Sequence, residues 1–394
     1  EIGGPSRFGH LEGIRIASVP KHLELLPYAV TRSRYIRPDA PNDPFNDGSR
    51  QDMRFGGDVK ALLTSNLTLD ATVNPDFGQV EVDPATVNLS AFETFFEEKR
   101  PFFVAGSGIF NFGNANCFFC SNFSSIESFY SRRIGRAPQG ASLAYDAGQF
   151  ADVPENSTIL GAAKITGRTS QGVTVGLLNA LTRREVASVV ETDGTRLKQE
   201  VEPLSNYLVG RATKDYRNGN LVIGVIGTSV VRRLGETALR DRLTSHAESF
   251  GGDLVLTWDK KNYQLLASAM LSSVAGDSAA IDRVQKSSAR YFQRPDRAVG
   301  GEGWFRSGLF NSSYRPGATG LRGLASYLRM AKDGGSFNWE AQANVRTPGF
   351  EVNDISFLSR ADYAQFIGNI AYGWTKPTHW YRDAALVVGG QQAQ

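Results

Sequence analysis

The sequence lacks a long apolar run, a strong net charge and more than a few cysteines and histidines, and each absence excludes a class of protein. Nowhere do about 18 or more apolar residues follow one another, which excludes a transmembrane helix. The 43 basic residues nearly balance the 40 acidic ones, so the basic excess of a nucleic-acid-binding protein is missing and no nucleic-acid partner is expected. The two cysteines and four histidines complete no metal-ligand set. We therefore expect neither a metal nor another cofactor.

The two cysteines are Cys117 and Cys120, three positions apart in one short aromatic stretch. A thioredoxin-like redox role would need a βαβ context, which the pattern does not provide. We predict a small loop disulfide between them. A reduced pair, and metal or redox chemistry, are the alternatives.

Glycine and aromatic residues are plentiful, and apolar residues recur at every second position. The chain has 41 glycines, 24 phenylalanines and 13 tyrosines, a composition typical of closed antiparallel sheets. From Asp58 to Asn74 nearly every odd position is apolar and the even positions are polar, with Leu62 and Ser65 as the breaks. Because successive side chains of a strand point to opposite faces, this predicts one long two-faced strand.

Further strands are predicted along the chain. Residues 1–22 are expected to be a linker leading into the first strand, Leu23–Tyr35, and residues 36–56 a loop rich in Pro, Asp, Asn and Gly. Paired alternating segments with short turns between them predict five hairpins: 158–168 with 172–182, 206–216 with 221–231, 253–258 with 263–271, 321–330 with 336–346, and 362–374 with 383–390. Roughly ten to twelve strands result.

The connections between these hairpins are long, whereas the turns within them are short. Outer-membrane barrels have this asymmetry, and aromatic residues at strand ends, such as Trp258, Tyr263 and Trp374, fit the boundary between lipid and water. We therefore predict an all-β fold, an antiparallel transmembrane β-barrel of residues 23–394, in which hydrocarbon lies outside and the inward charged rows stay hydrated. A soluble sandwich or propeller is the alternative. The chain stops without the terminal aromatic residue of a finished barrel, so we expect more sequence or a second chain to complete the wall.

Residues 75–135 interrupt the strand pattern with acids, prolines and aromatics, and we interpret them as an inserted segment that plugs the lumen. Within it, Ala85–Glu98 is predicted to form a short helix capped by Asn88 or Ser90. The acids are expected to pair with nearby bases and tie the segment to the lumen wall, since unpaired confined charges are costly. The candidate ligand-binding or lumen-network residues are Asp76, Glu81, Asp83, Glu98, Lys99, Arg100, Arg132 and Arg133.

Several stretches resemble the DUF5916 family. They are Asn74–Pro84, Val87–Leu89, Phe92–Phe96, Glu98–Phe103, Ser131–Pro138, Val209–Arg211, Asn218–Gly219, Ser288–Phe292 and Pro348–Asp354. The resemblance implies a bacterial outer-membrane-type barrel. Members of this family carry an N-terminal domain resembling carbohydrate-binding module family 9, which would lie before Glu1 here. The family has no settled biochemical activity.

Three functions compete at this point. The first is an outer-membrane barrel that binds or passes glycans or other nutrients at the cell surface. The second is a structural or assembly barrel with a sealed lumen that anchors a surface partner. The third, a glycan-cleaving hydrolase, would need two carboxylates about 5 to 10 Å apart, and no catalytic residue can be selected from the acids present, so a non-enzyme is expected. The expected partners are the lipid bilayer with its lipopolysaccharide, a glycan ligand and a protein partner in the outer membrane.

Overall fold

The structure, a computed structural model, describes residues 22–35, 37, 40, 42–75, 88–89, 93–113, 126–290 and 314–393. Its main feature is one antiparallel sheet of 13 strands, whose neighbours follow chain order except where β4, β7 and β8 are passed over. The strands are β1 (Leu23–Tyr35), β2 (Ser49–Thr64), β3 (Leu67–Val73), β5 (Ile159–Arg168), β6 (Val173–Thr182), β9 (Leu204–Tyr216), β10 (Leu221–Arg233), β11 (His246–Trp258), β12 (Tyr263–Ala275), β13 (Gly320–Lys332), β14 (Phe337–Arg346), β15 (Tyr363–Trp374) and β16 (Ala384–Ala393).

The first predicted strand and all five predicted hairpins are confirmed. β1 has the predicted bounds, and each hairpin pairs in register around its short turn. The turn between β9 and β10 shows why Asn-Gly is placed there, because Asn218 (φ 56°) and Gly219 (φ 82°) both have left-handed backbone conformations. These two residue types adopt that conformation at low cost, so the turn sets the register of both strands.

The single long strand predicted for Asp58–Asn74 is wrong. The chain turns at Ser65 and Asn66, and β3 folds back on β2 with Lys60 opposite Asp70. The break in alternation at Ser65 marked this turn, where the hydroxyl of Thr64 accepts the N–H of Asn66 at 3.3 Å. The predicted loop 36–56 is also too long, since β2 begins at Ser49. Because one predicted strand is in fact two, β2 and β3, the main sheet has 13 strands where at most twelve were predicted.

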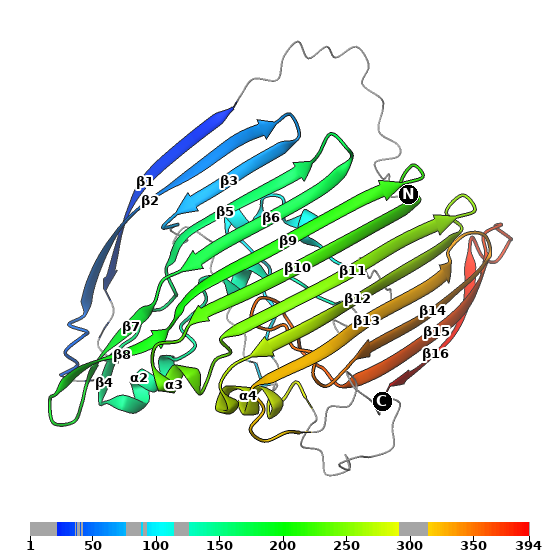
Figure 1. Ribbon diagram of the computed structural model, residues 1–394. Helices are drawn as coiled ribbons and strands as arrows, with labels where there is room; N and C mark the ends of the chain where they lie inside the picture. The colour runs from blue at the N-terminus through cyan, green and yellow to red at the C-terminus, as the bar shows by residue number, and fades with distance from the viewer. Residues whose placement is uncertain are drawn as a thin grey trace.

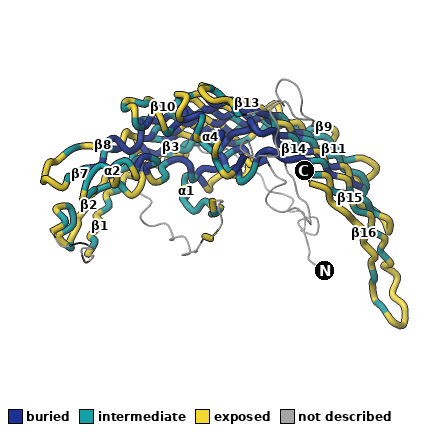
Figure 2. The backbone as a smooth tube through the Cα atoms, turned by 90° about the horizontal axis from the view of Figure 1, so that it is seen from below, coloured by how far each residue is buried: buried dark blue, intermediate teal, exposed yellow. Residues whose placement is uncertain are grey.

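The sheet is strongly curved, so that in Figure 2 it forms an arch with α1 beneath it. The concave side is called the inner face here and the convex side the outer face. β1 and β16 are the two edges of the sheet, and within the described residues they do not pair with each other. An all-β antiparallel sheet is therefore confirmed, whereas closure into a barrel is not observed.

A second, three-stranded sheet lies at one end of the main sheet, together with several short helices (Figure 1). It consists of β4 (Phe150–Asp152), β7 (Glu185–Val190) and β8 (Arg196–Glu202), and α2 (Ala141–Ala147) packs on β7 and β8 around Ala187, Val189 and Val201. α3 (Thr237–Arg240) and α4 (Ser278–Gln285) lie at the same end. The hairpin β7–β8 falls inside the connection 183–204, where no strand was predicted.

The inserted segment contains three short helical turns among its described residues: α1 (Pro101–Val104), η2 (Ser107–Phe110) and η3 (Ser131–Arg133). The helix predicted for Ala85–Glu98 is wrong over residues 93–98, which are extended. The helix starts instead at Pro101, whose fixed φ and missing N–H suit a first helical position. No helix in the described parts of the chain combines the length and the apolar character that crossing a bilayer requires.

The main hydrophobic core lies on the inner face of the sheet. It joins Phe110 and Ile134 of the inserted segment, Tyr207 and Met270 of the strands, and Phe350 of the connection between β14 and β15. This core is not the interior of two stacked sheets. It forms because the inserted segment and one connection cover the centre of a single curved sheet.

Candidate functional site

The two faces of the main sheet differ in chemistry as alternation predicts. In β10, the buried inner positions include Ile226, Thr228 and Arg232, while the outer positions between them are partly buried or exposed. Large apolar side chains are exposed on the outer positions of the strands; they include Leu177, Leu208, Ile223, Val225, Phe250, Leu271, Leu328, Met330, Phe366, Ile370 and Tyr372. A soluble protein seldom exposes so extensive an apolar surface.

Aromatic side chains gather where the strands meet their short turns. The rings of Trp258 and Tyr263 stack 5.4 Å apart on either side of the β11–β12 turn, and those of Tyr372 and Trp374 lie 4.9 Å apart at the end of β15. On the outer face of β11, apolar residues extend from Trp258 back to Phe250, and Glu248 follows. Eight residues of strand correspond to roughly 26 Å of length.

The inner face carries buried charges, and the inserted segment covers them. Lys164 of β5 has a side chain only 1% exposed, and its ammonium donates to the carbonyl oxygens of Phe102 and Ala105. The ring of Phe102 lies 4.9 Å from the same ammonium. Lys164 thus holds the α1 turn against the wall.

A second tie between wall and segment is the ion pair of Arg211 in β9 with Asp253 in β11. Two hydrogen bonds of 2.6 and 2.8 Å join the guanidinium to the carboxylate, and the side chains are 2% and 5% exposed. The N–H of Gly113 approaches the same carboxylate at 3.4 Å, and the guanidinium lies 5.5 Å from the ring of Phe112. The expectation that the inward charges stay hydrated is therefore wrong here, because the inserted segment excludes water from them.

The predicted pairing of acids and bases is found for Glu98. Arg100 donates to it from Nε and Nη2, at 2.8 and 2.7 Å, and Ser131 donates its hydroxyl at 2.5 Å. Burial raises the pKa of Glu98, but the hydrogen bonds from Arg100 and Ser131 outweigh burial and lower it below its ordinary value. Lys99 contributes its backbone N–H to the same carboxylate. The pair lies within the inserted segment, so it fixes the shape of this segment and does not tie it to the wall.

Arg133, another predicted site residue, contacts both the inserted segment and the connection between β14 and β15. Its side chain, 6% exposed, donates twice to Glu93 at 2.7 Å and from Nε to the carbonyl of Ser356 at 2.8 Å. Arg132 donates to the carbonyl of Glu97 at 2.8 Å. The structure thus joins Glu98, Lys99 and Arg100 in one set of contacts, and it gives Arg132 and Arg133 separate partners in residues 93–97 of the inserted segment. The other predicted site residues, Asp76, Glu81, Asp83, Cys117 and Cys120, lie outside the described residues.

The connection between β14 and β15, residues 347–361, folds inward and is called the inner loop here. Arg232 of β10 binds Asp354 at 2.6 Å, and Arg290 binds Glu351. Burial raises the pKa of Asp354, but the nearby Arg232 and Arg136 lower it below its usual range. The backbone N–H of Tyr130 donates to Ile355 at 2.9 Å. The inner loop therefore connects the wall with the inserted segment.

Sequence reasoning missed the wall residues of this arrangement, namely Lys164, Arg211 and Asp253, and it treated the inner loop as a plain connection. A signal was present, because each of the three is a charged residue at an inward position of an alternating strand. A charge at such a position needs a partner, which only the folded chain identifies.

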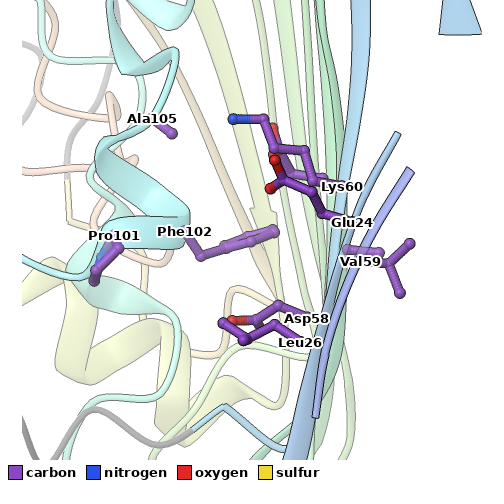
Figure 3. Close-up of a pocket in the computed structure, with 10 residues that line it drawn as sticks. Glu24, Leu26, Asp58, Val59, Lys60, Pro101, Phe102 and Ala105 are labelled. Carbon is purple, nitrogen blue, oxygen red and sulfur yellow. The ribbon is translucent and has the colours of Figure 1, made fainter. Parts of the chain in front are cut away.

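A cleft lies between α1 of the inserted segment and the wall, and Figure 3 shows its lining. Its volume is about 240 Å³. The wall side is formed by β1, β2 and β3, and α1 forms the other side; the lining residues are Glu24, Leu26, Asp58, Val59, Lys60, Asp70, Ala71, Pro101, Phe102 and Ala105. In the described part of the chain, no three His, Cys, Asp or Glu side chains gather as metal ligands would.

Comparison with known proteins gives one family and several distant structures. The family described as "Domain of unknown function (DUF5916)" matches residues 19–394. No curated protein matches the chain. Among solved structures, a loop-deletion mutant of OmpT, an outer membrane protein of Vibrio cholerae, is 10% identical over 95% of this chain and 99% of its own, with a TM-score of 0.27.

Two further structures are similarly distant. The outer membrane protein OpdK of Pseudomonas aeruginosa is 9% identical over 95% of this chain and 90% of its own, with a TM-score of 0.25. A BenF-like porin of Pseudomonas fluorescens is 8% identical over 94% of this chain and 92% of its own, with a TM-score of 0.23. These TM-scores are too low to establish a shared fold.

Proposed function

The chain belongs to the DUF5916 family, and from this premise we propose that it forms the wall of a bacterial outer-membrane β-barrel plugged by its inserted segment. The observation that carries the proposal is the two-faced sheet. Exposed apolar side chains cover its outer face, and buried charged side chains lie on its inner face. Lipid around the outer face removes the cost of exposing the apolar side chains, and the inserted segment supplies partners for the buried charges of the inner face.

The apolar band has the extent that a bilayer requires. A membrane strand needs about nine to eleven residues tilted by about 45°, and the five outer positions of β11 from Phe250 to Trp258 span nine residues. The aromatic side chains at the short-turn end would then lie at one lipid–water boundary. On this basis the bilayer, with its lipopolysaccharide, is the partner of the outer face.

Site-directed labelling tests this placement. In a background with Cys117 and Cys120 replaced by serine, Ile223→Cys and Glu248→Cys each place one thiol on the outer face, at the middle and beyond one end of the apolar band. With the protein in liposomes, a water-soluble maleimide is expected to label Glu248→Cys and not Ile223→Cys. Equal labelling of both thiols would mean that the outer face meets water, and the proposal would be wrong.

We further propose that the barrel binds or passes small polar nutrients, glycans among them, through the space that the plug leaves open. The cleft beside α1 supports passage, because α1 does not fill it and four charged side chains are among the residues that line it. Planar-bilayer recordings of the full chain test this role. Steady conductance that sugars reduce is the expected result, and a membrane-inserted protein that stays silent would contradict it.

A sealed barrel that anchors a partner protein is the second candidate. It is favoured by the buried ion pairs Arg232–Asp354 and Arg290–Glu351, which hold the inner loop against β10 and against the connection that follows α4, as a fixed closure would. Silence in the same recordings would support this candidate. A catalytic role is not proposed, since Glu93 and Glu98, two acids of the described inserted segment, are held by Arg133 and Arg100.

A further inference from the structure

Charges of alternating sign cross the inner face on four neighbouring strands. Glu24 of β1 lies opposite Lys60 of β2, Lys60 opposite Asp70 of β3, and Asp70 opposite Lys164 of β5. Directly opposed residues of an antiparallel pair point to the same side. All four side chains therefore point to the inner face, because Lys164 does.

The described part of the inserted segment covers only one end of this row. The side chain of Lys164 is 1% exposed, that of Asp70 is 17% exposed, and that of Glu24 is 58% exposed. Lys164 lies 3.9 Å from Asp70 but directs its hydrogen bonds to the carbonyls of α1. Exposure thus rises from β5 toward β1, along the inner wall and away from α1.

The uncovered part of the row lines the cleft. Figure 3 shows Glu24, Asp58 and Lys60 pointing from the strands toward Phe102, while Val59 points to the opposite side of the sheet. Three carboxylates, those of Glu24, Asp58 and Asp70, and the ammonium of Lys60 line the cleft. Two of these carboxylates also have a basic partner outside the lining, since Glu24 lies 2.5 Å from His22 and Asp70 lies 3.9 Å from Lys164. The cleft volume of about 240 Å³ holds several water molecules.

We propose that this cleft is the path by which the barrel passes small solutes, and that it passes small hydrated cations in preference to anions. The inference rests on the proposed passage function and locates it. Three features support it: the central inner face is packed, the β1–β3 wall is not, and the uncovered wall has an excess of carboxylates. A narrow passage with low-dielectric walls concentrates the field of such charges, and rings of Asp and Glu favour cations in this way.

The test measures the reversal potential of the full chain in planar bilayers under a KCl gradient. We expect potassium to be favoured over chloride. The single variants Glu24→Gln and Asp58→Asn should each lower the permeability ratio about two- to fivefold, since one charge at a few ångströms in a hydrated passage contributes about that factor. Lys60→Gln should raise the ratio by a similar factor. Glu248→Gln removes an exposed acid of the outer face and should leave the ratio unchanged.

The outcomes separate this inference from the proposed function. Sugar-sensitive conductance without cation preference, or with a ratio that the variants at Glu24, Asp58 and Lys60 leave unchanged, would overturn the path and keep the passage function. Silence of the inserted protein would overturn both and favour the sealed barrel. Because the cation preference is measured first on the unaltered chain, the inference remains testable even if a variant fails to fold.

Discussion

The buried pair of Arg211 and Asp253 gives the sharpest prediction about this fold. Asp253→Ala would leave the guanidinium of Arg211 in a site where the pair is 2% and 5% exposed, with Phe112 5.5 Å away. Removing one partner of a buried ion pair costs about 3–5 kcal/mol, because the remaining charge loses its compensation. We expect a loss of this size in the free energy of unfolding.

The chain offers a matched control in Arg168 and Asp215. Like Arg211 and Asp253, this pair joins two strands of the sheet with one strand between them, here β5 and β9, at 2.6 Å, but its side chains are 51% and 38% exposed. Water screens such a pair, so Asp215→Ala should cost about 0.2–1 kcal/mol. Comparing the two variants isolates burial as the cause, since distance and charge type are alike.

The measurement is guanidinium unfolding in lipid or detergent, followed by tryptophan fluorescence. The double variant Arg211→Met/Asp253→Leu removes both charges and should be far more stable than Asp253→Ala, because apolar side chains often replace a buried pair without loss. A cost for Asp253→Ala no larger than that for Asp215→Ala would refute the reasoning. It would mean that water fills the inner face and that the inserted segment does not cover it.

Three further predictions concern the outer face, the inserted segment and the inner loop. Ile223→Arg should destabilise the lipid-embedded protein by about 2–4 kcal/mol, whereas Glu248→Arg, beyond the apolar band, should cost about 1 kcal/mol or less. Unfolding from liposomes measures both costs. Equal costs would contradict a bilayer around the outer face. The pKa of Glu98 is lowered in the folded chain, so its stabilisation is present above the ordinary glutamate pKa and lost as pH falls through the lowered value. Glu98→Gln should therefore flatten the acid side of the stability profile, and an unchanged profile would contradict this. A Cβ on Gly323 would collide with the backbone of the inner loop, and one on Gly373 would meet nothing within 4 Å. Gly323→Ala should therefore make the inner loop more susceptible to limited proteolysis, whereas Gly373→Ala should not. Equal protection of the inner loop in both variants would show that the close approach at Gly323 does not hold the loop in place.

The strands could be predicted because their information is local. Two-residue alternation gives the faces, and Asn218 with Gly219 fixes a turn, so the hairpin β9–β10 can be identified without knowing any distant contact. The missed turn at Ser65 and Asn66 was also local, and its single break in alternation was too weak a signal beside the regular pattern around it. The hairpin β7–β8 was missed because its strands are short and belong to a separate small sheet.

The network of the inserted segment was predictable only in part. The sequence indicated that Glu98 and its neighbours pair with nearby bases, and Arg100 is only two residues away. It did not indicate the partners of Lys164 or Asp253, which are about 60 and 140 residues distant in the chain. Nor did it indicate that the inner loop, with Glu351 and Asp354, would bind Arg290 and Arg232.

What the sequence by itself determined is the two-faced antiparallel sheet, since side-chain direction along a strand depends only on position. The tertiary structure decided which of the inward charges are shielded from water. Lys164 and Arg211 are buried because the inserted segment lies on them, whereas the described part of this segment leaves Glu24 58% exposed. The same alternating pattern thus produces a packed interior at the centre of the sheet and an open charged cleft at its edge, and only the position of α1 separates the two.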